Sequence, residues 1–239
     1  MKQIRAVLER GLRAAVEPVV AWFTRRRVHP NVLSTIGFLV TCSSGFFFHQ
    51  HHVRTAGFLI LLGGVFDIFD GTVARRTGLA SPFGAFYDST LDRLSEIIVY
   101  LGLLSLYNDY RLELGDVGMI YWVMLAMAGS LMISYTRARA EGLGVRCDIG
   151  MMQRAERVIL IGFAALVFGE ATIWNVQGLA LRVVIIGLAI LTNATVLQRM
   201  LWVYRHSRPH GRPEPDAAVR PPADESYFAE PPGPGGRNP

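Results

Sequence analysis

Six long apolar segments constrain the fold of this chain more than any other feature of its sequence. A helix of about 20 apolar residues is long enough to cross the hydrocarbon core of a lipid bilayer. Only 18% of the 239 residues are charged, compared with about 25% in typical soluble domains, which argues against a soluble globular protein. We therefore predict an all-α integral membrane protein with six transmembrane helices, over residues 32–48, 56–74, 83–107, 117–139, 155–173 and 179–204.

The regions that flank these helices divide the chain into three parts. In residues 1–27, apolar side chains from Ile4 to Phe23 recur at helical spacing with arginines between them, which predicts an N-terminal juxtamembrane amphipathic helix. This helix lies either on the membrane surface or on the protein's own cytosolic face. Residues 28–205 form the predicted transmembrane domain. Residues 206–239 hold nine of the 12 prolines and too few apolar side chains to fold alone, so we predict a disordered cytosolic tail.

Basic side chains are distributed very unequally between the predicted loops. Placing the N-terminus in the cytosol puts 20 lysine and arginine residues on the cytosolic side and three, Arg54, Arg111 and Arg182, on the opposite side. Because cytoplasmic loops of membrane proteins carry an excess of lysine and arginine, both termini are expected to be cytosolic. The sequence thus predicts a multi-pass protein of the cell membrane.

Four aspartates lie inside the second and third predicted helices, in the most apolar part of the chain. Asp67 and Asp70 are three residues apart, and Asp88 and Asp92 are four apart, so each pair shares one helix face. Carboxylates within a bilayer are costly unless they are paired, solvated or bound to a cation. The connection around residues 75–83 is short and contains Gly78, so the two helices are expected to be antiparallel neighbours whose acidic faces converge near the cytosolic end. Their oxygen ligands favour Mg²⁺, Mn²⁺ or Ca²⁺ over zinc. We interpret them as a divalent-metal site for a phosphate-bearing substrate. A polar contact between helices, or an ion pathway in a small cation transporter, remains an alternative.

The aspartates belong to a longer pattern. It reads Asp67-x-x-Asp70-Gly71-x-x-Ala74-Arg75, then eight residues, then Gly84-x-x-x-Asp88-x-x-x-Asp92. This pattern resembles the signature of the CDP-alcohol phosphotransferases, a family of membrane enzymes with six transmembrane helices. Its members transfer a phosphatidyl or other phosphoalcohol group from a CDP-linked donor to an alcohol and release CMP. The resemblance extends over residues 28–205 and includes the start of the first helix, where a threonine is common at the position of Ser34.

The resemblance implies roles for the residues of this pattern. Two divalent ions, Mg²⁺ or Mn²⁺, would be held by Asp67, Asp70, Asp88 and Asp92. Asp92 would also act as the base that deprotonates the acceptor hydroxyl. The donor, CDP-diacylglycerol, would contact Asn31, Ser34, Asp67, Asp70, Gly71, Ala74, Arg75 and Gly84. The resemblance further implies a homodimer in contact with membrane lipids, and no nucleic-acid partner is expected.

A second group of residues bears on the acceptor. The stretches 134–141, 153–157 and 195–199 resemble those of the phosphatidylinositol phosphate synthases, the branch of the family that uses inositol phosphate. By this resemblance the acceptor's phosphate would be held by Ser134, Arg137, Arg154 and Arg199, although the branch commonly has lysine at position 137. Several arginines suit a doubly charged phosphate, but arginines at cytosolic helix ends also serve simply to orient a membrane protein. The expected product is phosphatidylinositol phosphate. Phosphatidylglycerophosphate synthesis from glycerol 3-phosphate is the alternative within the family.

Overall fold

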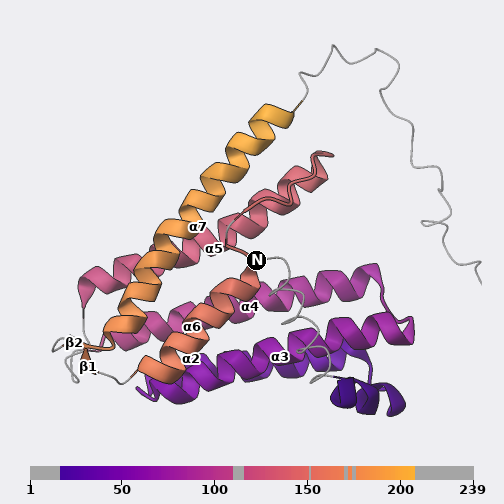
Figure 1. Cartoon of the computed structure of the whole chain (residues 1–239), viewed down its shortest axis with the longest axis horizontal. Coiled ribbons are helices and arrows are strands. Elements are labelled where there is room, and N and C mark those ends of the chain that lie inside the picture. The colour runs from indigo at the N-terminus through magenta and orange to yellow at the C-terminus, as the bar shows by residue number, and fades with distance from the viewer. Residues whose placement is uncertain (1–16, 110–115, 151, 170–171, 174–175, 208–239) are drawn as a thin grey trace, which may run out of the picture.

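The computed structural model of this chain describes residues 17–109, 116–150, 152–169, 172–173 and 176–207, and these are almost entirely helical. The elements are α2 (Pro30–His49), α3 (Val53–Thr77), α4 (Pro82–Tyr107), α5 (Val117–Gly142), α6 (Arg154–Phe168), β1 (Thr172–Ile173), β2 (Val176–Gln177) and α7 (Leu179–His206) (Figure 1). A further helical segment over residues 17–25 precedes α2. The two short strands pair antiparallel between α6 and α7. Apart from this hairpin, the described fold is all-α, as the apolar segments predict.

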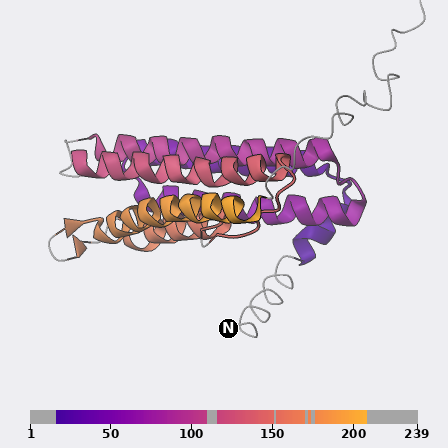
Figure 2. The same ribbon diagram turned by 90° about the horizontal axis from the view of Figure 1, so that it is seen from above.

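The helices form two groups that separate at one end of the molecule. α3 and α4 both pack against α2, α6 packs against α3, and α5 packs against α7. In Figure 1 the C-terminal halves of α5 and α7 lean away from α3 and α4. Seen from above in Figure 2, the axes of the long helices are nevertheless roughly aligned. The turn between α3 and α4 and the end of α5 therefore share the splayed end, which is where the candidate site lies.

A tight turn between α3 and α4 makes these two helices antiparallel. Gly78 ends α3 with a left-handed backbone, φ 68°, which glycine adopts without steric cost. The Ser81 side chain then accepts the backbone N–H of Gly84 at 3.0 Å, and Pro82 occupies the first turn of α4. The short connection expected between the two halves of the aspartate pattern is thus confirmed.

Glycines allow the helices around the site to approach one another closely. A Cβ at Gly102 of α4 would lie 2.6 Å from the Cα of Gly45 in α2, closer than two carbon atoms can pack. A Cβ at Gly57 of α3 would overlap the backbone of Leu166 in α6. Because larger residues would force these helices apart, the glycines fix how α4 and α6 sit around α2 and α3.

Four helices in the described part of the chain are long and apolar enough to cross a membrane, namely α2, α3, α5 and α7. α4 has sufficient length, but it carries several charged side chains. The predicted end of the fifth helix at residue 173 was wrong, because α6 has 15 residues and ends at Phe168. Gly169 and the charged Glu170 follow Phe168 in the sequence. Gly169 lowers the helix propensity at this point, and the chain then turns into the β1–β2 hairpin.

The described part of the N-terminal region, residues 17–25, packs on the protein itself. Its apolar side contacts α2 and α3, where Val20 is 1% exposed. Glu17 accepts two hydrogen bonds from Arg76, at 2.7 and 2.5 Å, and these lower the pKa of the Glu17 carboxyl below its usual value. Most of the predicted amphipathic helix, and nearly all of the predicted C-terminal tail, lie outside the described residues.

Candidate active site

The two halves of the aspartate pattern line adjoining cavities beside the α3–α4 turn. Asp70 and Asp88 line a cavity of about 220 Å³ next to the turn. Asp67, Asp88 and Asp92 line a smaller and more enclosed space. Because Asp88 and Ser34 contribute to both walls, the structure brings all four predicted metal-binding aspartates to one place.

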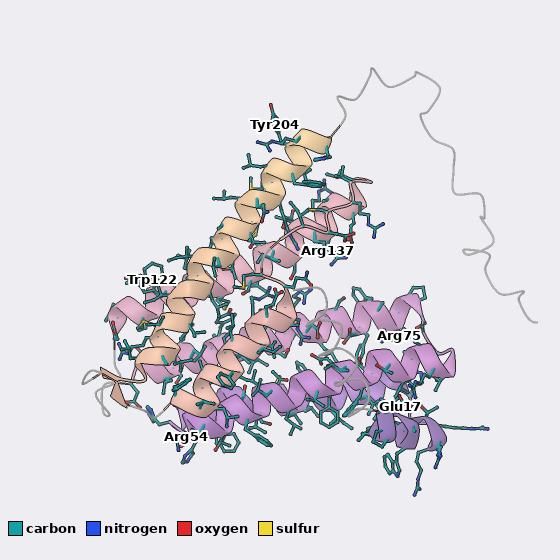
Figure 3. The ribbon with its side chains drawn as sticks, in the orientation of Figure 1. Glu17, Arg54, Arg75, Trp122, Arg137 and Tyr204 are labelled. Atoms are coloured by element: carbon teal, nitrogen blue, oxygen red, sulfur yellow. The ribbon has the colours of Figure 1, made fainter. Side chains whose placement is uncertain are left out.

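The larger of these two spaces, called the donor cavity below, contains nearly all of the predicted donor-binding residues. Its walls include Asn31, Ser34, Asp70, Gly71, Ala74, Arg75 and Gly84. Asp67, the remaining predicted donor contact, lines the adjoining space. Figure 3 shows Arg75 near the end of α3. A Cβ at Gly71 would lie 3.4 Å from Nη1 of Arg75, and one at Gly84 would lie 3.2 Å from Oγ of Ser81, which lines the same cavity. The absence of side chains at these two positions therefore leaves space in the cavity.

The carboxylates receive hydrogen bonds from two other helices. In α2, the buried Ser34 hydroxyl donates to Oδ2 of Asp70 at 2.6 Å. In α6, Arg154 donates from Nη1 to Oδ2 of Asp67 at 2.5 Å, and its Nη2 forms an ion pair with Oδ1 of Asp92 at 2.8 Å. Arg154 therefore bridges α3 and α4 and balances part of the negative charge of four neighbouring carboxylates, which would otherwise repel one another.

The acidic side chains do not form a ready-made metal cage. Within the described residues, no three histidine, cysteine, aspartate or glutamate side chains meet closely enough to hold an ion. Arg154 and Ser34 instead occupy oxygens of three of the four carboxylates. The donor set nevertheless fits a hard divalent cation. Four carboxylates on two neighbouring helices line adjoining cavities, and such cations prefer oxygen ligands.

A third cavity, of about 1090 Å³ and called the acceptor cavity below, is lined by residues of α4, α5, α6 and α7. All four predicted acceptor-binding residues line it, namely Ser134, Arg137, Arg154 and Arg199. Asp92 lines it as well, so the cavity borders the aspartates directly. Figure 3 shows Arg137 on the half of α5 that leans away from α4. The structure thus brings together residues from three separate stretches of the sequence.

Two acids hold Arg137 at the edge of the acceptor cavity. Arg137 donates to Oε1 of Glu141 at 2.9 Å and to Oδ1 of Asp148 at 3.2 Å. Asp148 also accepts from Nε of Arg146 at 2.5 Å. This hydrogen bond, together with the charges of Arg146 and Arg137, lowers the pKa of Asp148 below its usual value, so Asp148 is ionised at neutral pH. Sequence reasoning did not single out Asp148, although the alternation of acids and arginines over residues 137–148 was an available signal.

Arg199 is held differently, by the backbone of the cavity wall. Its side chain is 5% exposed. It donates from Nε to the carbonyl oxygen of Ile149 at 2.9 Å, and from Nη1 to the carbonyl oxygen of Ile133. These bonds use two of its five N–H donors, so Arg199 ties the loop before α6 to α5 and α7 and still has donors for a ligand.

A fourth arginine, Arg157, lines the acceptor cavity although sequence reasoning did not assign it to the site. It pairs with Glu96 of α4, with distances of 2.7 Å from Nε to Oε1 and 3.1 Å from Nη2 to Oε2. Glu96 lies four residues after Asp92 and therefore on the same face of α4, but this spacing does not identify its partner. The partner lies 61 positions away, and only the packing of α6 determines it.

Comparison with known proteins identifies the family of this chain. The sequence profile described as CDP-alcohol phosphatidyltransferase matches residues 27–203. The chain belongs to the CDP-alcohol phosphatidyltransferase family. This membership confirms the family predicted from the aspartate pattern, and with it the class of enzyme, a transferase for phosphate-linked alcohols.

Individual members of the family match most of the chain. It is 33% identical to the archaetidylinositol phosphate synthase of Methanothermobacter thermautotrophicus, over 86% of this chain and 94% of that protein. It is 31% identical to the phosphatidylinositol phosphate synthase of Streptomyces avermitilis, over 90% of this chain and 88% of that protein.

Solved structures of the family also resemble this fold. The crystal structure of Mycobacterium tuberculosis phosphatidylinositol phosphate synthase with CDP-DAG bound matches with a TM-score of 0.69 at 27% identity, covering 80% of this chain and 96% of that chain. The same enzyme in complex with manganese and citrate matches with a TM-score of 0.70 at 27% identity, covering 80% and 92%. Family membership therefore rests on most of the chain and not on the aspartate pattern alone.

Proposed function

We propose that this protein synthesises phosphatidylinositol phosphate, by transferring the phosphatidyl group of CDP-diacylglycerol to inositol phosphate with release of CMP. The observation that carries the proposal is the acceptor cavity, which Ser134, Arg137, Arg154 and Arg199 line and Asp92 borders. Guanidinium groups suit a phosphorylated alcohol, because their N–H donors match phosphate oxygens. The two relatives support inositol phosphate as that alcohol, since one is an archaetidylinositol phosphate synthase and the other a phosphatidylinositol phosphate synthase.

In this proposal the donor cavity receives the CDP part of the donor. Gly71 and Gly84 leave the space for it, and Arg75 supplies positive charge for its diphosphate. The four aspartates of the pattern would hold the divalent ions, two Mg²⁺ or Mn²⁺. When bound, such ions neutralise the charge that develops on the departing CMP. The complex of the M. tuberculosis relative with manganese supports a divalent metal in this family.

Asp92 is the base in the proposed reaction. The acceptor hydroxyl forms a new bond to the phosphorus that carries diacylglycerol, the pyrophosphate bond to CMP breaks, and the hydroxyl proton passes to Asp92. Asp92 borders the acceptor cavity, which gives it access to that hydroxyl. It must first separate from its ion-pair partner Arg154, which lines the same cavity. Arg154 is then available to the acceptor's phosphate.

We also propose that all six helices from α2 to α7 lie in the bilayer, within a transmembrane domain of residues 28–205. The charged residues of α4 are compatible with this, because Asp88 and Asp92 line cavities within the protein. The arginine distribution supports cytosolic termini and a cytosolic active site. The helical spacing of the apolar side chains from Ile4 to Phe23 supports the N-terminal amphipathic helix, and the family resemblance supports the homodimer.

Single-cysteine labelling tests this topology. After replacement of Cys42 and Cys147 by alanine, Gly144→Cys before α6 and Asn108→Cys after α4 would lie on opposite sides of the membrane. A membrane-impermeant thiol reagent added to intact cells is expected to label position 108 only. Labelling of position 144 would contradict the proposed orientation.

Product identification tests the proposed function. The purified protein in detergent would be supplied with CDP-diacylglycerol, Mg²⁺ and inositol phosphate, and its lipid product analysed by mass spectrometry. Phosphatidylinositol phosphate is expected, formed in equal amount to CMP. Asp88→Asn is the inactive control. CMP release without any lipid that contains inositol phosphate would contradict the proposal.

A further inference from the structure

Two ion pairs join α4 to α6, one helix turn apart. Asp92 and Glu96 are four residues apart in α4, and Arg154 and Arg157 are three apart in α6, so each couple shares a helix face. The outer pair joins Arg154 to Asp92 at 2.8 Å. The inner pair joins Arg157 to Glu96 through two hydrogen bonds, of 2.7 and 3.1 Å. The two helices are therefore held in register by two consecutive pairs of opposite charge.

The inner and outer pairs differ in how firmly they are held. In the inner pair the Arg157 and Glu96 side chains are 1% and 9% exposed. In the outer pair the Arg154 and Asp92 side chains are 23% and 16% exposed, and both line the acceptor cavity. Separating the inner pair would leave a charge buried without its counter-charge, which is very unfavourable. The outer pair can open toward the cavity, whereas the inner pair cannot open without disrupting the bundle.

Arg157 also fixes the point at which α6 begins. Its Nη1 donates to the carbonyl oxygen of Met152 at 3.1 Å, two residues before the helix. Arg154 is the first residue of α6, and a capping box of Gln153 and Glu156 surrounds it. The position of the Arg154 side chain thus depends on a helix start that Arg157 holds both to its own loop and to Glu96.

We propose that Glu96 and Arg157 are positioning residues, which hold the start of α6 so that Arg154 stands between the aspartates and the acceptor cavity. The inference rests on the proposed function, in which Arg154 exchanges Asp92 for the acceptor's phosphate. Neither Glu96 nor Arg157 needs to touch a substrate for this role. The inner pair keeps the start of α6, and with it Arg154, in place. The outer pair is the one that opens.

A double variant in which both members of the inner pair are replaced by apolar residues distinguishes a positioning role from a role in folding. Single substitutions such as Glu96→Gln leave Arg157 buried and uncompensated, and the protein then risks not folding. Several apolar residues line the same small cavity as the inner pair, among them Ile60, Val99 and Val158. Because buried ion pairs are often replaced by apolar residues of similar volume without loss of stability, Glu96→Leu with Arg157→Met is expected to unfold near the wild-type temperature.

The expected kinetic result is a difference between the two substrates. In the Glu96→Leu/Arg157→Met variant, the KM for inositol phosphate should rise at least about tenfold, the effect of weakening one strong contact. The KM for CDP-diacylglycerol should stay within about threefold, because the donor cavity contains neither residue. Equal changes in both KM values, or a wild-type acceptor KM in the folded double variant, would overturn the inference.

A second variant and a control complete the experiment. Arg157→Lys keeps a charge for Glu96 but loses the paired hydrogen bonds, and should raise the acceptor KM several-fold while leaving the donor KM unchanged. An unchanged acceptor KM would count against positioning. Arg182→Gln breaks an ion pair with Asp116 at the other end of the bundle, and should change neither KM. If the wild type itself releases no CMP with inositol phosphate, the proposed function fails, which is a separate result from a failure of positioning.

Discussion

Arg154 and Asp92 form an ion pair, with 2.8 Å between Nη2 and Oδ1, across the boundary between the acceptor cavity and the aspartates. Sequence analysis assigned these residues to different tasks, Arg154 to the acceptor's phosphate and Asp92 to the acceptor's hydroxyl. Because the two side chains are paired with each other, neither is free for its proposed task until the pair separates. The pair therefore couples preparation of the base to preparation of the phosphate site.

Replacing a pattern aspartate should abolish turnover without unfolding the protein. We expect Asp70→Asn and Asp88→Asn to insert and purify normally, because asparagine has the same shape, but to release no measurable CMP. The matched control is Asp109→Asn, which alters an aspartate that pairs with His51 far from the pattern. Turnover of Asp88→Asn close to that of the control would contradict a metal-binding role for Asp88.

Removal of divalent metal should inactivate the wild-type protein reversibly. EDTA is expected to stop CMP release, and added Mg²⁺ or Mn²⁺ to restore it, because carboxylate ligands bind these ions and release them to a chelator. The measurement is the rate of CMP release before chelation, after chelation and after metal is restored. Full activity in metal-free buffer would exclude this site as a metal centre.

Asp92→Asn should lose turnover while the donor still binds. Removal of a positioned base typically lowers the rate about 10²- to 10⁴-fold, and a share in metal binding would enlarge the loss. The KM for CDP-diacylglycerol should change little, because Asp92 does not line the donor cavity. Steady-state kinetics distinguish the two quantities. A variant within about threefold of wild-type kcat would show that another group takes the proton.

Arg154→Ala should weaken acceptor binding more than donor binding. A charge-assisted hydrogen bond contributes about 1.5–3 kcal/mol, which corresponds to a roughly ten- to hundredfold rise in KM for inositol phosphate. Arg199→Ala is expected to act in the same direction. Arg139→Ala is the control, since Arg139 is an exposed arginine at the same end of α5 as Arg137 that does not line the acceptor cavity. If all three variants have the same kinetic constants, these arginines orient the protein in the membrane and do not bind the acceptor.

Gly102→Ala should destabilise the protein because of the contact between α4 and α2. Its new Cβ would lie 2.6 Å from the Cα of Gly45, and overpacking of this kind costs about 1–3 kcal/mol. Gly187→Ala in α7 is the matched control, since nothing lies within 4 Å of its Cβ position and alanine favours helix. The thermal unfolding midpoint in detergent should fall for the first variant only.

The sequence predicted local features well because their causes are local. Asp67, Asp70, Asp88 and Asp92 share helix faces through spacing alone, and Gly78 marked the turn that sets the two faces together. The sequence could not predict the partners of Arg154 and Arg157. Arg154 and Asp67 are 87 positions apart, and their contact depends on how closely α6 packs on α3. The end of α6 was misplaced because the predicted segment was extended past Gly169 and Glu170 to residue 173, whereas the helix ends at Phe168.

The central claim is that the acceptor is recognised through its phosphate and is an inositol phosphate. The most direct measurement is kcat/KM for CMP release by the purified wild-type protein with CDP-diacylglycerol and three acceptors in parallel: inositol phosphate, unphosphorylated inositol and glycerol 3-phosphate. The account predicts that inositol phosphate exceeds each of the other two by at least about tenfold. Equal or greater kcat/KM with glycerol 3-phosphate, or efficient use of unphosphorylated inositol, would contradict it.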